Sequence, residues 1–345
     1  MPEPKTDTAI GVVIVTFNSA DVIAGCLDSL VAQAGARPTI IVVDNASDDA
    51  TVTTVRVWAA GQKANLGGNA LVEVSSDDAA HTPISAPVIL MHSGANRGFA
   101  GGVNLGLAVL AAHRDIAHFW ILNPDAYADP KAALAILASA RENPGYGLMG
   151  GRVCYAEPPF HVQIDGGTIN RWTGVTSNLN LGKEAARAVL PTSEQVDFIT
   201  GANMVASRRF YAAVGPLRED YFLYYEEADW ALRRGTLPLI VAPGFVVYHH
   251  AGTSIGSPTP ERIASPFSFW FKYRSRMKFV RRFNPLAVPV AATYATAKAV
   301  QLMLKGAFPQ ASALLSAVFG LPAPKSVRDR LSPEAARIAF GKARR

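Results

Sequence analysis

The sequence lacks the features that stabilise secreted domains or anchor a chain in a membrane. Its 345 residues include only two cysteines, Cys26 and Cys154, and both lie in apolar surroundings. A disulfide framework needs more cysteines than this, so we expect two buried thiols and a reducing compartment such as the cytosol. No stretch reaches the roughly 18 apolar residues of a membrane span. The short apolar run that follows residues 1–10 does not predict a signal peptide.

Charge is also scarce, and its distribution excludes one class of partner. Asp, Glu, Lys and Arg make up 17% of the chain, and the formal net charge is +6. The basic excess lies towards the C-terminus, which predicts a local anionic partner and no general affinity for nucleic acid. The sequence has no internal repeat, no low-complexity tract, and neither a Walker loop nor a dinucleotide fingerprint. Its 49% hydrophobic residues predict a folded chain of roughly two domains.

The first 130 residues alternate between strand and helix patterns. Residues 11–15 and 39–43 are β-branched runs, each followed by polar residues and then by apolar residues at helical spacing. Residues 88–91 and 119–122 are two further short apolar runs. Successive units of this kind predict right-handed crossovers and a parallel sheet.

Other parts of the chain depart from this alternation. Residues 61–87 lose the periodicity, and we predict an insertion there with one weak hairpin around residues 70–74. Beyond residue 130 the apolar runs shorten, which predicts an antiparallel or irregular half with a strand at residues 196–199 and two late strands at residues 239–242 and 246–248. Residues 265–345 predict a helical C-terminal region.

The start of that C-terminal region interleaves aromatic and basic side chains over residues 265–283. Such a run is usually a core helix with a solvated face. Its density of both residue kinds also fits a helix in a membrane interface, where each basic residue contributes about 1 kcal/mol near an anionic leaflet. We therefore expect this region to associate with an anionic membrane surface.

Polar side chains follow the ends of the four predicted parallel strands. After the fourth strand, Pro124 blocks helix at Asn123, so Asn123 and Asp125 are held on an extended turn. Ligands of open α/β sheets bind at this edge. Asp44 ends the second strand, and its carboxylate can accept hydrogen bonds from a base or ribose or can cap the next helix. The same residue types also make ordinary strand-to-helix turns, with Asp129 as the cap.

A glycine-rich segment, residues 96–104, follows the third strand and begins a helix. Glycines at a helix start bring backbone amides close to a phosphate group, and Arg97 can form a bidentate pair with it. The alternative is close packing of the helix against the sheet.

An acidic cluster and a histidine pair complete the polar set. Glu226, Glu227 and Asp229 lie within one helical turn, and at least one of them is expected to be structural because acids favour a helix N-terminus. His249 and His250 end the last predicted strand. A carboxylate at a strand end, a downstream acid and a downstream histidine form the set needed to transfer a group from a nucleotide diphosphate.

Six segments, taken in order, resemble the inverting glycosyltransferases of family 2, especially the bacterial rhamnosyltransferase-like branch. They are VVIVTFNSA, IIVVDNASDD, NRGFAGGVNLG, ILNPDAY, ITGANM and FLYYEEADWALR, and the resemblance covers about residues 10–254. It implies an α/β GT-A fold, with a Rossmann-like, mostly parallel sheet, helices on both faces and a C-terminal helical extension. The GT-A domain would comprise residues 1–264. Its first 130 residues would bind the nucleotide sugar, and residues 131–264 the acceptor.

The resemblance also implies roles for particular residues. The catalytic base position falls on Glu227, where Asp is commoner. Asn123 and Asp125 stand where the family has an Asp-x-Asp motif, so Asp125 would face Mg²⁺ or Mn²⁺, with His249 as a further metal ligand. The donor-binding residues would be Thr16, Asn18, Asp44, Asn45, Arg97, Gly98, Asn123 and Asp125, and the acceptor-binding residues Thr200, Gly201, Asn203 and Asp229.

The implied reaction moves a sugar from a dTDP-rhamnose-like or UDP-sugar donor to a hydroxyl of a glycan or polyprenyl-linked acceptor. It would serve cell-surface polysaccharide synthesis at the inner face of the cell membrane. Two alternatives stay open. A sugar-phosphate nucleotidyltransferase would need a Gly-rich triphosphate loop after Val15, where the chain has Thr-Phe-Asn-Ser. A non-catalytic nucleotide-sugar or glycan-binding module would need no acid at Glu227.

Overall fold

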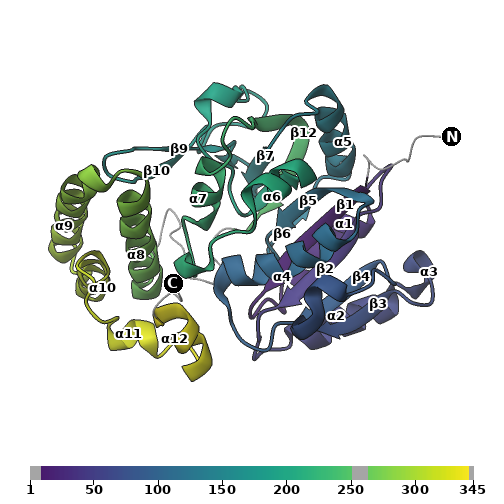
Figure 1. The fold of residues 1–345 in the computed structure, drawn as a ribbon, viewed down its shortest axis with the longest axis horizontal. Coiled ribbons are helices and arrows are strands. Elements are labelled where there is room, and N and C mark those ends of the chain that lie inside the picture. The colour runs from purple at the N-terminus through teal and green to yellow at the C-terminus, as the bar shows by residue number, and fades with distance from the viewer. Residues whose placement is uncertain (1–8, 251–262, 342–345) are drawn as a thin grey trace.

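The computed structural model describes residues 9–250 and 263–341, which form one ten-stranded sheet with helices on both faces, together with a two-stranded ribbon (Figure 1). The order of the large sheet is β3-β4-β2-β1-β5-β11-β7-β12-β6, and β8 pairs with β7 outside this order. Residues 251–254, the end of the stretch that resembles family 2, lie outside the described residues.

Parallel strands form the N-terminal half of the sheet. They are β1 (Ala9–Thr16), β2 (Thr39–Asp44), β3 (Leu71–Ser75), β4 (Val88–His92) and β5 (Ile116–Leu122). Val12 of β1 lies opposite Ile40 of β2 and Trp120 of β5. Both faces of these strands are buried, so β-branched residues fill them without alternation, and the predicted parallel half is confirmed.

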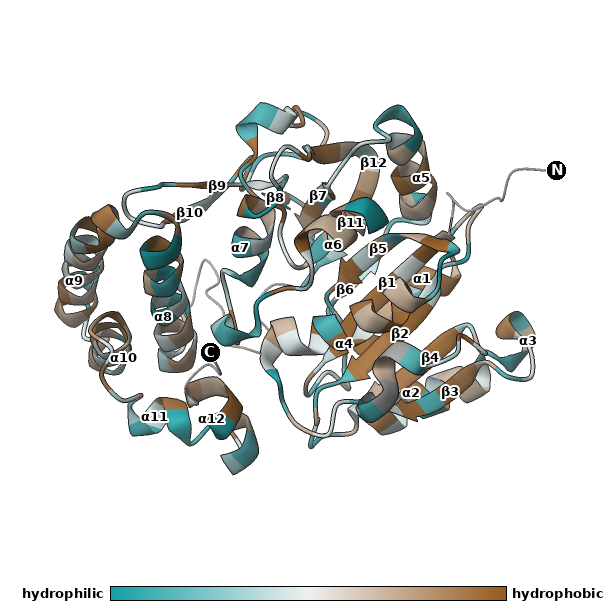
Figure 2. Cartoon of the chain, in the orientation of Figure 1, coloured by the Kyte–Doolittle hydropathy of each residue, from teal (hydrophilic) through white to brown (hydrophobic). Residues whose placement is uncertain are grey.

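Alternate side chains of the central strands pack against different helices. Val12 and Ile14 belong to the apolar cluster that includes α1 (Ile23–Val31), α2 (Thr51–Gly61) and α5 (Ala132–Glu142). Val13 belongs to a second cluster with α4 (Gly98–Ala112) and the C-terminal helices. Figure 2 shows these central strands as the most hydrophobic part of the fold.

The predicted insertion at residues 61–87 is wrong in its topology. The segment holds α3 (Lys63–Leu66), the edge strand β3 and a 3-10 helix, η1 (Ser76–His81). β3 pairs in parallel with β4, Leu71 opposite Val88, and forms no hairpin. As an edge strand, β3 has no buried residue, so its sequence carries no strong apolar signal.

The second half of the sheet is mixed. Its strands are β6 (Ala126–Ala128), β7 (Leu148–Tyr155), β8 (Val162–Ile164), β11 (Asn203–Ser207) and β12 (Leu239–His249), while β9 (Gly167–Ile169) and β10 (Thr176–Asn178) form the ribbon. β11 runs antiparallel to β5 and β7, and β12 runs parallel to β7.

Two strand predictions in this half are corrected. The strand predicted at residues 196–199 lies instead at β11, and Phe198 makes only an isolated bridge to Gly167. Two predicted late strands form the single strand β12. Its pairing with β7 shifts between Val241 and Val246, where Pro243 offers no N–H and Gly244 has φ +74°, so the apolar pattern is interrupted without ending the strand.

The helices of the second half are α6 (Arg208–Val214), α7 (Glu226–Leu232), α8 (Pro266–Phe283), α9 (Val288–Leu304), α10 (Phe308–Val318), α11 (Lys325–Arg328) and α12 (Pro333–Phe340). α8 is the aromatic and basic segment, and Ser265 caps it by accepting from the Ser268 amide. Its aromatic residues Phe267, Trp270 and Phe271 are buried in the same cluster as the sheet face.

The aromatic side chains of this helix are committed to the core, as in the alternative of a core helix with a solvated face, and its association with a membrane stays a prediction. Phe271 stacks on Phe222, with ring centroids 5.1 Å apart, and Phe340 of α12 covers Trp270 from the other side. In the described part of the chain, no helix combines the length and apolarity that crossing a bilayer requires.

The close packing of α4 on β1 gives a test of the fold. A Cβ at Gly106 would lie 2.5 Å from Cγ1 of Val13, whereas a Cβ at the exposed helical Gly25 would meet nothing within 4 Å. We expect Gly106→Ala to lower the free energy of unfolding by about 1–3 kcal/mol through overpacking. Gly25→Ala should raise it by about 0.5–1 kcal/mol. Urea unfolding of both variants measures this, and equal stabilisation by the two would contradict the packing.

Candidate active site

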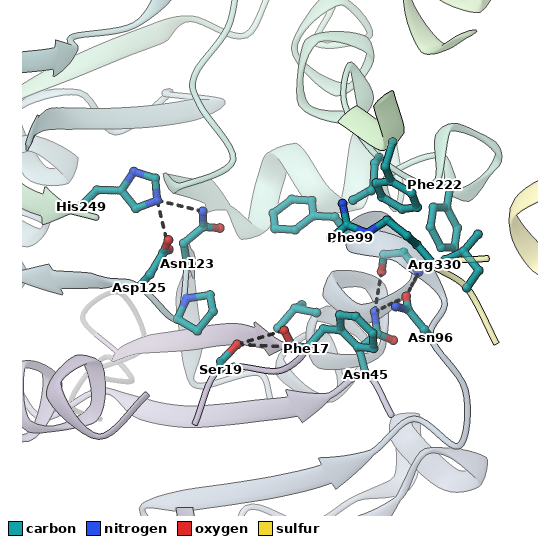
Figure 3. Close-up of a pocket in the computed structure, with 16 residues that line it drawn as sticks. Phe17, Ser19, Asn45, Asn96, Phe99, Asn123, Asp125, Phe222, His249 and Arg330 are labelled. Atoms are coloured by element: carbon teal, nitrogen blue, oxygen red, sulfur yellow. Dashed lines mark hydrogen bonds and ion pairs between the residues drawn. The ribbon is translucent and has the colours of Figure 1, made fainter. Parts of the chain in front are cut away.

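A cavity of about 180 Å³ lies at the carboxyl edge of the parallel strands, where the sequence predicted a site. Its walls come from the segments that follow β1, β2, β4 and β5, from the end of β12, and from the C-terminal region (Figure 3). The lining residues are Val15, Phe17, Ser19, Asn45, Asn96, Gly98, Phe99, Asn123, Pro124, Asp125, Phe222, Leu223, His249, Phe267, Arg330 and Leu331.

Asp125 and His249 meet at one end of this cavity. β12 pairs antiparallel with β6 so that His249 lies opposite Ala126, and its Nε2 comes 3.0 Å from Oδ1 of Asp125. Nδ2 of Asn123 lies 3.2 Å from the same nitrogen. On the far side of the ring, Nδ1 lies 2.8 Å from Oε1 of Gln163. That oxygen only accepts, so the contact uses a proton on Nδ1, which is the arrangement that a metal-ligating Nε2 requires.

The side chain of His250 does not face Asp125. Its Nδ1 pairs with Oε1 of Glu157 at 2.8 Å, and its ring lies beside Tyr127. His249 is the last residue of β12 and His250 follows the strand, and the two side chains have different partners. Of the two, only His249 lies beside Asp125.

The Asp125 and His249 pair fits a divalent cation. Two ligands in neighbouring positions of an octahedral ion, each at about 2.1 Å, lie about 3 Å apart, and the observed spacing is 3.0 Å. Gln163 supplies the outer contact that fixes the tautomer of a ligating histidine. Among the described residues no third His, Cys, Asp or Glu joins the pair. Remaining positions would be filled by phosphate oxygens and water, as is usual for Mg²⁺.

Cys26 lies under this end of the cavity. Its Sγ donates to the carbonyl of Asn123 at 3.6 Å, and burial together with the Asp125 charge raises the pKa of the thiol well above its usual range. Burial also raises the pKa of Cys154. Both cysteines are free and buried, as predicted, and both are poor nucleophiles.

The opposite end of the cavity is built around Asn45 and the start of α4. Nδ2 of Asn45 donates to the Gly98 carbonyl at 3.0 Å, and its Oδ1 accepts from the Arg97 amide at 3.0 Å. Gly98 has φ +73°, and a Cβ there would lie 2.3 Å from the carbonyl oxygen of Phe222. Only glycine fits this position, and the Phe99 amide uses the space to donate to the same oxygen at 2.9 Å.

Three predicted donor-binding residues lie beneath or beside the cavity and do not line it. Thr16 Oγ1 donates to Oδ1 of Asp44 at 3.3 Å, and Oδ2 of Asp44 accepts from the Ser47 amide. Asn18 has φ +52°, and its Oδ1 accepts from the Asp48 amide. These contacts fix the loops that follow β1 and β2.

The Arg97 side chain is likewise absent from the cavity lining. Its Nε donates to the carbonyl of Ser93 at 3.3 Å, so the guanidinium stiffens the loop before α4. The backbone of Arg97 is the part that contacts a lining residue, Asn45.

Asp229 and Asn203 do not have the surroundings expected for acceptor binding. Asp229 is fully buried, where it pairs with Arg233 at 2.7 Å and with Arg282 of α8 at 3.1 Å, and accepts from the Tyr221 hydroxyl. Asn203 is also fully buried, and its Oδ1 accepts from Nε1 of Trp120 at 2.8 Å. Neither lines the cavity, so Asp229 is the structural acid of its cluster.

Thr200 and Gly201 lie nearer to the cavity. Phe99, a lining residue, would sit 3.0 Å from a Cβ at Gly201. The Asn123 amide donates to the Ala202 carbonyl at 3.1 Å, which ties this segment to the metal-facing turn. A bulkier residue at Gly201 would push on the wall of the cavity.

Glu226 and Glu227 begin α7 with carboxylates withdrawn from water. One oxygen of each, Oε2, is buried and has no hydrogen-bond partner among the described residues. Burial raises the pKa of both carboxyl groups, most strongly that of Glu226, while the Lys272 ammonium opposes the rise at Glu227. A raised pKa suits a carboxylate that takes up a proton near neutral pH.

The backbone before these acids is strained. Phe222, Tyr224 and Tyr225 have φ between +65° and +71°, a region that costs a non-glycine residue about 1–3 kcal/mol. Contacts hold it in place, including the Tyr225 hydroxyl, which donates to the Gly174 carbonyl at 2.6 Å. Strain of this kind persists where the surroundings over-determine a conformation, and here it fixes the start of α7.

Several lining residues carried no signal in the sequence. Phe99 and Asn96 flank the glycines that were recognised. Phe222 and Phe267 were aromatic residues without a pattern that points to a cavity. Arg330 comes from the turn after α11, and its guanidinium lies 5.0 Å from the centre of the Phe267 ring (Figure 3). Arg330 lies some 200 residues after Asp125 in the sequence, and no local pattern predicts that both line the same cavity.

Comparison with known proteins agrees with this arrangement. The sequence pattern of glycosyl transferase family 2 matches residues 11–209, more than half of the chain. The chain belongs to glycosyl transferase family 2. Of the predicted site residues, Glu227, Asp229 and His249 lie beyond the matched family 2 segment.

Two solved structures resemble this family 2 chain over most of its length. One is the mannosyltransferase PcManGT from Pyrobaculum calidifontis in complex with GDP-Man and Mn²⁺, with a TM-score of 0.50, 18% identity, and coverage of 94% of this chain and 79% of that chain. The other is GalNAc-T7 with UDP, GalNAc and Mn²⁺, with a TM-score of 0.52, 11% identity, and coverage of 85% and 51%. These likenesses show the fold, which is GT-A-like.

A curated relative is similar over a shorter stretch. The low-salt glycan biosynthesis hexosyltransferase Agl10 of Haloferax volcanii is 28% identical over 143 residues, which are 41% of this chain and 44% of the relative. The matched region thus spans less than half of that protein.

Proposed function

We propose that this family 2 chain is an inverting glycosyltransferase that moves a hexosyl group from a nucleoside diphosphate sugar to an acceptor hydroxyl, with Mg²⁺ or Mn²⁺. The pairing of Asp125 with His249 at 3.0 Å, at the carboxyl edge of a nucleotide-binding sheet, carries the proposal. The two similar structures contain Mn²⁺, which supports a divalent metal for this chain. A rhamnosyl donor and a role in cell-surface polysaccharide synthesis remain the sequence-based proposal for donor and pathway.

Different residues would have different roles in a single displacement reaction. The lining residues Asn45 and Asn96 would contact the nucleotide, and the Arg330 guanidinium would add a positive charge for its phosphates at the same end. Asp125 and His249 would hold the cation, which neutralises charge on the departing diphosphate. Glu227 would accept the proton of the acceptor hydroxyl as its oxygen bonds to the anomeric carbon and the bond from that carbon to the diphosphate breaks.

The position of Glu227 supports its role as base. Glu227 itself lines neither cavity, but Phe222 and Leu223, which precede it, line the donor cavity, and its buried Oε2 has no hydrogen-bond partner among the described residues. Asp229 is already bound by two arginines and a tyrosine, so it has no free oxygen for an acceptor.

The donor and metal assignments are tested together by product release from labelled sugar nucleotides. Transfer releases a nucleoside diphosphate, a sugar-phosphate nucleotidyltransferase would instead release inorganic diphosphate from a nucleoside triphosphate, and a binding module would release neither. We expect nucleoside diphosphate, dependent on divalent metal and abolished in Asp125→Ala with the melting temperature unchanged. Release that survives both EDTA and this substitution would reject the metal assignment.

The same test has a readout without turnover. Gln163→Ala should weaken Mn²⁺ binding in the presence of UDP by about 10- to 100-fold, because Gln163 orients the His249 ring. Glu157→Gln, which removes the partner of His250, is the matched control and should bind Mn²⁺ as wild type does. Titration calorimetry measures both.

The catalytic base has its own prediction. Glu227→Gln should lower turnover by about 10²–10⁴ while leaving donor affinity near wild type. A base works only when ionised, so the raised pKa of Glu227 places the acid limb of the pH–rate profile above the ordinary carboxyl value of 4.5, and this limb should vanish in the variant. Asp229→Asn should instead lower stability, because it removes the charge of the buried carboxylate that pairs with Arg233 and Arg282. A pure turnover defect in Asp229→Asn with an active Glu227→Gln would exchange their roles.

We also propose peripheral association with the inner face of the cell membrane, through α9 in place of α8. α9 lies outside α8, away from the sheet (Figure 1), and exposes Val290, Tyr294, Val300 and Leu304, the last with 84% of its surface exposed. Residues 263–328 include ten Lys or Arg and no Asp or Glu. An apolar helix face within a basic segment is complementary to an anionic lipid surface.

Vesicle flotation tests this surface. Wild type should bind anionic phosphatidylglycerol vesicles in preference to neutral phosphatidylcholine, and added salt should weaken the binding. The double variant Val300→Glu with Leu304→Glu should lose it, whereas Val57→Glu, at an exposed position of α2 far from α9, should not. Equal partition to both vesicle types would reject the electrostatic part, and binding unaffected by the double variant would reject α9.

A further inference from the structure

A second cavity, of about 350 Å³, lies between α8 and α9. Its lining combines cations with aromatic rings. The cations are Lys272 and Arg276 of α8 and Lys298 and Lys305 of α9, and the other lining residues are Tyr224, Ile263, Ala264, Ser268, Phe269, Tyr273, Tyr294, Gln301 and Leu302. Among residues 9–250 and 263–341 no Asp or Glu lines it, and none of the ion pairs there involves these four cations.

Arg276 is the most constrained of these cations. Only 4% of its surface is exposed, its Nε donates to the Tyr225 hydroxyl at 2.9 Å, and its guanidinium lies 4.4 Å from the centre of the Tyr273 ring. Its Nη1 is buried and has no hydrogen-bond partner among the described residues. A buried guanidinium with an unused donor is costly unless an anion meets it.

The same excess of positive charge affects the pKa of the neighbouring Lys272. Burial, followed by the charges of Arg276 and Lys298, lowers the pKa of its ammonium to about 8, and only Glu227 opposes this shift. An anion in the cavity would favour the charged form and raise this pKa again. Four cations converging on one cavity suit a group with more than one negative charge, and the arginine fork suits phosphate oxygens.

This cavity adjoins the donor cavity. Phe222 and Leu223 line the donor cavity, and the next residue, Tyr224, lines the second. Likewise Phe267 faces the first and Ser268 the second, and the Tyr224 hydroxyl lies 3.0 Å from the Ser268 hydroxyl. Glu227, the proposed base, interacts with Lys272 of the second cavity. An acceptor held there would reach the base and the donor from one side.

We propose that the cavity between α8 and α9 binds the phosphate or diphosphate group of an acceptor whose glycan is joined to an isoprenoid lipid. The inference rests on the proposed transferase function and names the acceptor's anionic group. Arg276 and the three lysines contact the phosphoryl oxygens, while the aromatic rings and the apolar face of α9 accommodate the adjoining isoprenoid chain. The reacting hydroxyl lies towards Glu227.

Direct binding of geranyl diphosphate, a short isoprenoid diphosphate, tests the assignment on the full chain without any turnover. Wild type should bind it, and Lys298→Gln with Lys305→Gln should weaken the affinity at least tenfold. Arg276→Gln should do the same, but the surface lysine pair keeps the test valid if that buried change unfolds the protein. The matched control Arg281→Gln with Lys325→Gln removes two exposed charges outside the cavity and should change the affinity less than twofold.

Further arms separate the possible sources of the anion and the two cavities. The affinity for UDP with Mn²⁺, which reports the donor cavity, should be unchanged in the lysine pair variant. Inorganic diphosphate binding as tightly as geranyl diphosphate would replace the lipid-linked acceptor with a free anion and overturn the assignment. Loss of UDP binding in the lysine pair variant, or no binding of geranyl diphosphate to wild type, would also overturn it. Failure of sugar transfer with this binding intact would instead count against the proposed function.

Discussion

The contact between the start of α4 and the carbonyl of Phe222 is the constraint on which the site depends. It joins the loop after β4, in the nucleotide-binding half, to the segment that leads into α7. Because Gly98 has no Cβ, the carbonyl oxygen of Phe222 can lie 2.3 Å from the position that a Cβ would occupy. The same oxygen accepts a hydrogen bond of 2.9 Å from the Phe99 amide. Because Phe222 lies on strained backbone four residues before Glu226 and five before Glu227, this one contact relates the proposed donor pocket to the proposed base.

α8 secures the other side of the same segment. Ser275 donates to the Leu223 carbonyl at 2.8 Å, Arg282 pairs with Asp229, and the Lys278 ammonium donates to the Asp220 carbonyl. The basic and aromatic residues of this helix therefore clamp residues 220–229 against the sheet. The clamp explains why the residues around the acid pair can remain strained without relaxing.

The parallel half of the fold is predictable from the sequence because its strands are buried on both faces. Burial forces β-branched runs such as those of β1 and β2, and parallel connection forces polar residues to meet at one edge, so Asn123, Asp125 and Asn45 could be assigned to one site. The His249 and Asp125 contact followed from a family resemblance and not from spacing, since 123 residues of chain separate them. The edge strand β3 was missed because solvent on one side removes the apolar signal.

Two sequence-based assignments, those of α8 and Asp229, were left open by the sequence for the same physical reason. An aromatic and basic helix has the same composition whether its cations face lipid, water or buried carboxylates and carbonyls, so composition alone could not distinguish an interfacial helix from the clamp that α8 forms. Asp229 likewise has the same sequence context whether it meets an acceptor or Arg233 and Arg282. In both cases the answer depends on which partners the fold brings within about 3 Å, and those partners come from distant parts of the chain.

The same question of which partners the fold supplies applies to Lys272 and Arg276, two further cations of α8. Arg282 and Lys278 are matched by Asp229 and Asp220, whereas Lys272 and Arg276 form no ion pair with an acid among the described residues and line a cavity with two further lysines from α9. The clamp needs only Arg282 and Lys278. Lys272 and Arg276 destabilise the folded chain through mutual repulsion unless a ligand neutralises their charge. Uncompensated charge next to the proposed base is therefore best explained by an anionic substrate group.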